Sequence, residues 1–92
     1  IAVSTQPHLA EKLVSNIKEV KARGARILLI TTQDNGIALA EADERLFIPQ
    51  ADPMLEPMIS VIPAQLLAYY CSVQLGYDPD KPRNLAKSVT VE

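Results

Sequence analysis

Apolar residues recur every three or four positions between residues 9 and 23, and lysines and glutamates occupy the other face. The apolar positions are Leu9, Leu13, Ile17 and Val20. This spacing predicts an amphipathic helix with one buried side. Gly24 follows, and glycine is the usual residue just beyond a helix end because it adopts the left-handed conformation without strain. We therefore expect a helix over residues 9–23.

Residues 27–30 are continuously apolar, with the sequence Ile-Leu-Leu-Ile. A short uninterrupted apolar run is typical of a strand that is covered on both faces, as in a parallel sheet. We expect this strand over residues 26–32. Residues 37–42 have room for one or two helical turns, and residues 45–49 predict a second short strand that Pro49 closes.

The last long element is predicted over residues 56–75, which are mostly apolar, with Pro63 as a kink or a first-turn boundary. Helix, buried strand, loop, short strand and helix in this order predict an α/β fold. Only two strands are predicted, whereas parallel sheets usually have more strands and carry helices on both faces. We therefore expect an incomplete unit: the second half of a flavodoxin-like domain, with a parallel sheet flanked by helices.

Composition narrows the classes of function. The chain has 92 residues, of which 48% are hydrophobic and 4% aromatic, and its formal net charge is −2. This charge gives no basic footprint for nucleic acid, and no run of about 20 apolar residues is present to cross a membrane. The single cysteine excludes an internal disulfide and fits a reducing compartment, so we expect a cytoplasmic protein. The first residues lack the basic region and apolar run of a signal peptide, and the start without methionine predicts a fragment.

The end of the chain is unusual for a free terminus. Prolines at positions 79 and 82 prevent the preceding helix from continuing. The residues that follow include the apolar Leu85, Val89 and Val91, whereas poorly ordered termini usually consist of polar residues. A single lysine, Lys87, lies between two small residues in the middle of this tail. The pattern predicts an irregular tail that docks against other parts of the protein.

The tail also carries a family resemblance. Residues 76–92 read Gly-x-Asp-x-Asp-x-Pro-Arg-Asn-Leu-Ala-Lys-Ser-Val-Thr-Val-Glu, and these seventeen consecutive positions resemble the carboxyl terminus of the glutamine:fructose-6-phosphate amidotransferases. Residues 62–70, Ile-Pro-Ala-Gln-Leu-Leu-Ala-Tyr-Tyr, are similar to the last long helix of that family. The resemblance implies that residues 1–76 are the carboxyl-terminal half of a sugar isomerase (SIS) domain. Residues 77–92 would then be its C-terminal tail.

The resemblance also implies a chemistry. The parent enzyme of this family converts fructose 6-phosphate and glutamine to glucosamine 6-phosphate and glutamate, with no metal and no organic cofactor. Lys87 matches the family's tail lysine, which would form a Schiff base with the sugar, and the backbone of Ala86 would line the same pocket. The partners implied are the sugar phosphate, the glutaminase domain of the parent chain and a second copy in a homodimer. The fragment alone is expected to be inactive, since the phosphate-binding residues would lie upstream.

Three other features invite functional interpretation. His8 is the only histidine and has no Cys or His partner for a metal site, so we expect a solvated side chain. Cys71 lies in the last predicted helix with no base nearby in sequence, so we expect a buried, inert cysteine. Residues 31–36 follow a predicted strand, where ligands of α/β sheets bind, but they match no phosphate-binding fingerprint. An Asx-type turn is expected there, with a ligand loop as the alternative.

Two other classes of function remain open at this point. One is a non-catalytic SIS module that binds a sugar phosphate as a regulator, for instance beside a DNA-binding domain. The other is a stand-alone interaction domain whose tail has no function. The tail signature with Lys87 favours the enzyme, because neither alternative requires a lysine at a fixed position near the terminus.

Overall fold

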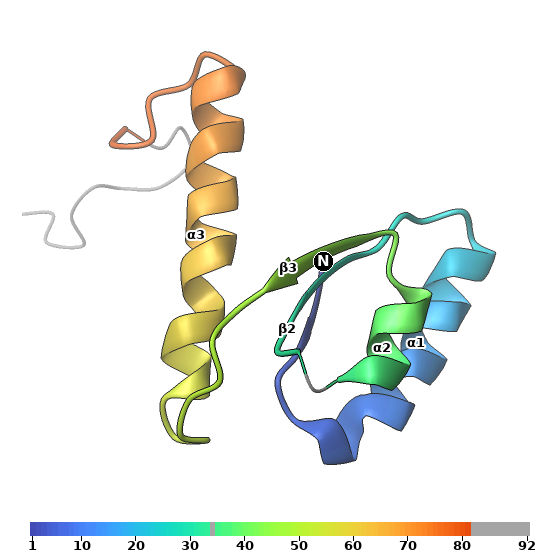
Figure 1. Ribbon diagram of the computed structural model, residues 1–92. Coiled ribbons are helices and arrows are strands. Elements are labelled where there is room, and N and C mark those ends of the chain that lie inside the picture. Colours follow the sequence, from blue (N-terminus) through green and yellow to red (C-terminus); the bar gives the residue numbers. More distant parts are fainter. Residues whose placement is uncertain (34, 82–92) are drawn as a thin grey trace, which may run out of the picture.

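The computed structural model describes residues 1–33 and 35–81, which form an α/β structure (Figure 1). The elements along the chain are β1 (Ala2–Ser4), the 3-10 turn η1 (Pro7–Leu9), α1 (Ala10–Ala22), β2 (Leu28–Thr31), α2 (Gly36–Glu41), β3 (Glu44–Phe47) and α3 (Glu56–Gln74). The predicted α/β class and the predicted order of helices and strands are confirmed.

The strands form one parallel sheet in the order β1-β2-β3. β1 corrects the prediction of two strands. Three residues are too few to show a hydrophobic period, and β1 is defined by its pairing with β2, in which Val3 lies opposite Ile30. In the next pairing Ile30 lies opposite Leu46, so these three side chains share one face of the sheet.

The other face of the sheet carries the core. α1 and α2 lie side by side on this face, and Val14, Leu29 and Ala38 pack together between the helices and β2 (Figure 1). Leu29 and Ala38 are fully buried.

The predicted helix is confirmed as α1, but its buried residues are Ala10, Val14 and Ile17. Of the four apolar positions that predicted the buried side only Ile17 is buried, while Leu9 is 50% and Val20 46% exposed.

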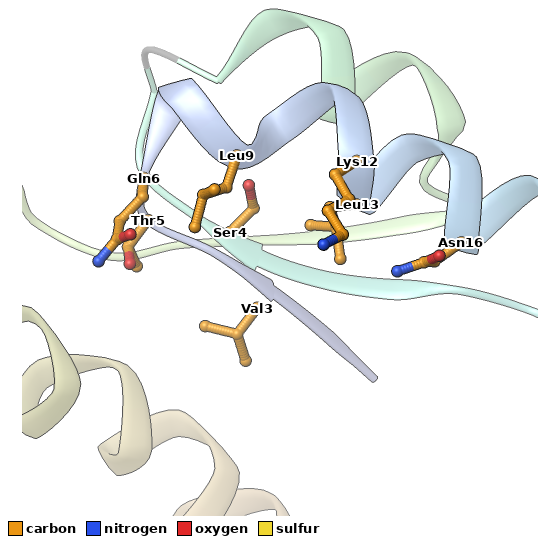
Figure 2. Close-up of a pocket in the computed structure, with 8 residues that line it drawn as sticks. All are labelled: Val3, Ser4, Thr5, Gln6, Leu9, Lys12, Leu13 and Asn16. Atoms are coloured by element: carbon orange, nitrogen blue, oxygen red, sulfur yellow. The ribbon is translucent and has the colours of Figure 1, made fainter.

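The face that carries Val3, Ile30 and Leu46 is largely uncovered; we call it the open face. Val3 is 46% exposed and Leu46 37% exposed, while Ile30 between them is buried. Val3 points away from α1 (Figure 2), and α3 stands beside the sheet and contacts β2 (Figure 1). Parallel sheets are normally covered on both faces. The exposure of the open face therefore agrees with the expectation of an incomplete unit.

Glycines end the two longer helices in the same way. The N–H of Gly24 donates to the Lys21 carbonyl and the N–H of Ala25 to the Val20 carbonyl, which is the Schellman pattern at the end of α1. Gly24 has a φ of 86°, as the sequence predicted for a residue just beyond a helix. Pro63 lies within α3, which continues through it, and Pro57 occupies the first turn.

If produced by itself, the 92-residue chain should self-associate, because the open face and the unpaired edge of β1 are exposed to water. Sedimentation velocity should show dimers or larger species, and thermal unfolding should be broad. Val3→Lys should shift the distribution toward monomer, since it places a charge on the open face. Val20→Lys is the matched control, because Val20 is also 46% exposed but lies on α1. A monomer with a sharp two-state transition would contradict the half-domain interpretation.

Candidate functional site

The carboxyl ends of the strands are the first place to look for a site. β1, β2 and β3 are parallel, so the segments that follow them meet at one edge of the sheet. Ligands of open α/β sheets bind at this edge. The segments present hydroxyl and amide groups from Thr5 and Gln6 after β1, Gln33 after β2 and Gln50 after β3.

A buried set of hydrogen bonds fixes this edge. The Thr31 hydroxyl donates to the Ser4 carbonyl at 2.6 Å, and the Asn35 side-chain amide donates to the same carbonyl at 2.8 Å. Asn35 also donates to the Ser4 hydroxyl at 2.9 Å. All three residues are at least 96% buried. The loop between β2 and α2 is therefore tied to the end of β1, which sequence reasoning missed because β1 itself was missed.

The loop of residues 31–36 supplies two of the residues in this set of hydrogen bonds, Thr31 and Asn35. Three polar residues of the loop are buried, Thr31, Thr32 and Asn35, and the side chains of Thr31 and Asn35 bond to Ser4 within the protein. Asp34 lies outside the described residues, so the expected Asx-type turn at that position stays a prediction. Nothing in the described part of the loop leaves a buried side-chain nitrogen or oxygen without a partner that could mark a ligand site.

A hollow of about 330 Å³ opens between the end of β1 and the first turns of α1 (Figure 2). Ser4, Thr5 and Gln6 line one wall, while Leu9, Lys12, Leu13 and Asn16 line the other. Its polar groups can bind a hydroxylated or amide ligand, and Lys12 can add one positive charge. The hollow borders β1, which pairs on one side only among the described strands, so it is equally suited to an added strand.

A second hollow, of about 400 Å³, lies where β2 and β3 end. Gln33, Phe47, Ile48, Pro49 and Gln50 line it. Neither of these two hollows is lined by aspartate, glutamate, histidine or cysteine. The described edge can therefore bind neutral polar groups, but its lining offers no side chain of the kinds usually used for general acid–base catalysis or as a thiol nucleophile, apart from Lys12.

The predictions made for individual residues from the sequence have different outcomes in the structure. Lys87 and Ala86 lie outside the described residues, so their assigned roles stay predictions. His8 is exposed in η1, as expected. The expectation of a buried Cys71 was wrong, because Cys71 is exposed on α3, where no side chain is buried. Within residues 1–33 and 35–81, no cluster of histidine, cysteine and acidic residues could hold a metal ion.

A separate charged cluster stabilises the opposite edge of the sheet. The Asp43 carboxylate accepts the N–H of Ile27 at 2.7 Å, and the Lys21 ammonium lies 3.6 Å from Asp43. Lys21 also donates to the Glu41 carbonyl at 2.9 Å. The hydrogen bond from Ile27, assisted by Lys21 and Arg26, holds the pKa of Asp43 below its ordinary value, against the opposing effect of desolvation. The cluster joins the end of α1 to the starts of β2 and β3.

The chain is similar to known proteins over most or all of its length. A family model described as SIS domain matches residues 1–75.

No helix in the described part of the chain has the length and hydrophobicity needed to span a bilayer.

Curated relatives match over the full length of this chain. The chain is 52% identical over 92 residues to the glutamine–fructose-6-phosphate aminotransferase [isomerizing] of Caldanaerobacter subterraneus subsp. tengcongensis. It is 48% identical over 91 residues to the Bacillus subtilis protein of that name and 47% identical over 92 residues to the one from Thermus thermophilus. The match covers 99–100% of this chain but only 14–15% of each relative.

Removing the Asn35 amide should loosen the candidate edge. Asn35→Ala leaves the buried Ser4 hydroxyl without this partner, a loss of about 1–3 kcal/mol. In a full-length protein that contains this chain, amide hydrogen exchange in β2 and α2 should become about tenfold faster, which corresponds to about 1.4 kcal/mol. Asn16→Ala is the control, since Asn16 is exposed on α1. Equal exchange in the two variants would show that the hydrogen bonds of Asn35 do not fix the edge.

Acid should weaken the Asp43 cluster. Because the folded-state pKa of Asp43 is lowered, its contribution to stability is present above the unfolded value of about 3.9 and is lost as the pH falls through the folded value. The difference in thermal stability between wild type and Asp43→Asn should be constant above about pH 5 and should shrink below the ordinary aspartate range. Asp52→Asn, in the loop before α3, serves as the control. A difference that does not change with pH would contradict this assignment.

Proposed function

The chain belongs to the SIS domain family, and we propose that it is part of a glutamine–fructose-6-phosphate aminotransferase, with its active-site lysine at Lys87. The single observation that carries the proposal is that the similarity to the named enzymes extends over all 92 residues. The matched segment therefore includes the tail as well as the SIS region. A regulator that only bound sugar phosphates would need the SIS region alone.

The proposed reaction begins with the open-chain form of fructose 6-phosphate. The Lys87 amine adds to the C2 carbonyl carbon, and loss of water gives a Schiff base. Ammonia derived from glutamine then displaces the lysine from C2, which regenerates the free amine. Transfer of a proton from C1 to C2, together with transfer of the C1 hydroxyl proton to the imine nitrogen, converts the resulting imine of the ketose into the 2-amino aldose phosphate. Overall, ammonia replaces one oxygen of the sugar, which leaves as water.

Such a lysine has to be uncharged when it attacks. An amine held beneath apolar neighbours loses hydration, which disfavours its ammonium form and lowers its pKa. The neighbours of Lys87 in sequence include Leu85 and Val89, which are suited to that purpose. Closure of the tail over the sugar would also exclude water from the Schiff base.

The described residues leave the remaining tasks to other parts of the longer protein. The two hollows at the carboxyl edge have Lys12 as their only charged lining residue, so we place the phosphate-binding groups and the base for proton transfer upstream of Ile1. We also propose a glutaminase domain in the same parent chain as the source of ammonia, and a cytoplasmic homodimer as its assembly. No organic cofactor or metal enters the proposed steps.

Lys87→Arg tests the central role in the full-length parent. Arginine keeps the positive charge but cannot deprotonate to a nucleophilic amine, so glucosamine 6-phosphate synthesis should be abolished. Borohydride added with fructose 6-phosphate should trap a covalent adduct on the wild-type peptide that contains Lys87. Mass spectrometry should find no adduct on that peptide in the arginine variant.

Two controls separate chemistry from folding. Glutamine hydrolysis should persist in Lys87→Arg, although stimulation by the sugar is expected to fall if tail closure is disturbed. Lys18→Arg changes another lysine to arginine at an exposed position on α1 and should retain synthesis. Unimpaired synthesis by Lys87→Arg would falsify the assigned role and favour a solvated tail lysine.

A further inference from the structure

Asn35 is followed by Gly36, and this is the one Asn-Gly pair in the chain. Asparagine is a chemically labile residue, and its side chain is most open to attack by the next backbone nitrogen when glycine follows, because glycine has no Cβ in the way. The other asparagines, Asn16 and Asn84, precede isoleucine and leucine, whose side chains obstruct that attack. Asn35 is therefore the position in this chain where spontaneous deamidation is chemically easiest.

The fold does not itself require glycine at position 36. A Cβ added to Gly36 would meet no atom of the described residues within 4 Å. The glycines with a positive φ in the described part of the chain are Gly24 and Gly76, so the backbone at Gly36 suits other residues as well. Gly36 is also the first residue of α2, and the N–H of a first helical residue has no acceptor within its helix. Its backbone nitrogen is therefore not held by the helix.

The Asn35 side chain, by contrast, is held firmly by the end of β1. Asn35 is 2% exposed, and its side-chain nitrogen donates to the Ser4 carbonyl at 2.8 Å and to the Ser4 hydroxyl at 2.9 Å. This nitrogen is the atom that leaves in deamidation, so the reaction has to break both hydrogen bonds. Deamidation consequently requires the loop between β2 and α2 to open away from β1, a local unfolding event.

We propose that Asn35 is a site of spontaneous deamidation and that the opening of this loop controls the reaction. The backbone nitrogen of Gly36 forms a bond to the side-chain carbonyl carbon of Asn35. The Asn35 side-chain nitrogen leaves as ammonia with the proton that Gly36 loses, and a cyclic imide remains. Water then opens the ring at either carbonyl, which gives aspartate or isoaspartate. One water enters and one ammonia leaves, so no oxidant or cofactor is needed.

The product prevents the loop from closing again. A carboxylate has no hydrogen to donate, so it faces the Ser4 carbonyl as a second acceptor. The charge would also be placed where Asn35 is 98% buried, which disfavours the closed form. Isoaspartate in addition lengthens the main chain by one carbon just before α2. The hydrogen bonds that fix the carboxyl edge thus protect it from a modification that would release it permanently, and this inference does not depend on Lys87 or on any sugar chemistry.

Peptide mapping by mass spectrometry tests the proposal on the full-length protein that contains this chain, incubated in mildly alkaline buffer. Ser4→Ala removes one acceptor of the Asn35 amide and should make deamidation of Asn35 about fivefold faster, the change expected for a lost hydrogen bond of about 1 kcal/mol. Gly36→Ala should make it several-fold slower, because the added methyl group obstructs ring closure. Amide hydrogen exchange in β2 and α2 separates the two effects, since it should become faster in Ser4→Ala but not in Gly36→Ala.

Wild-type protein unfolded in urea gives the rate without the fold, and it should lose the Asn35 amide many times faster than the folded protein. Asn16, exposed on α1, is the internal control and should keep its amide in every folded sample. Equal rates in folded and unfolded wild type would overturn the proposal, because the fold would then give no protection. Equal rates in folded wild type and Ser4→Ala would overturn it as well, because the bonds to Ser4 would then not control the opening.

Asn35→Asp carries the side chain of one product and tests the consequence of the modification. Amide hydrogen exchange in β2 and α2 should be several-fold faster in this variant than in wild type, because the loop cannot form its bonds to Ser4. Exchange at the wild-type rate would contradict the proposal that deamidation releases the carboxyl edge.

Discussion

A parallel sheet requires cover on both of its faces, and the rest of this structure depends on how that requirement is met. α1 and α2 cover one face, where Val14, Leu29 and Ala38 form the core. The open face has Val3, Ile30 and Leu46 in one row, and two of these three side chains are substantially exposed. The energy of burying such residues, about 25 cal/mol per Å² of apolar surface, is only partly realised by the chain alone. A chain that spans about 15% of its relatives' length is expected to obtain the remaining cover from other parts of a longer protein.

The described residues at the carboxyl edge of the sheet do not supply a complete set of catalytic groups. The carboxyl edge is held in place by Ser4, Thr31 and Asn35, whose polar groups satisfy one another. The edge is therefore polar, and Lys12 is the single ionisable residue among those that line its two hollows. In the proposed enzyme the reactive amine is carried by the tail, and this edge contributes to the scaffold that supports it.

The sequence predicted the elements that carry a local signal better than those that depend on long-range pairing. The 3.6-residue period of α1, the apolar run of β2 and the glycine at the end of α1 each reflect local physics, so all three were found. β1 was not predicted, because a three-residue strand owes its existence to pairing with β2 and leaves no period of its own. Cys71 was predicted to be buried because apolar neighbours in a helix usually indicate a core, but here the helix lies outside one. The interlock of Asn35 with Ser4 joins residues 31 positions apart, and such a contact has no signature in sequence.

The most direct test of this account is the oxidation rate of Val3 in the full-length protein, measured by hydroxyl-radical footprinting against Val20. Both valines are 46% exposed in the chain described here, but Val3 lies on the open face and Val20 on α1. If the longer protein completes the unit, Val3 should be strongly protected while Val20 remains reactive. Equal oxidation of the two valines would mean that the open face stays in water, and would contradict the conclusion that this chain is one part of a larger α/β unit.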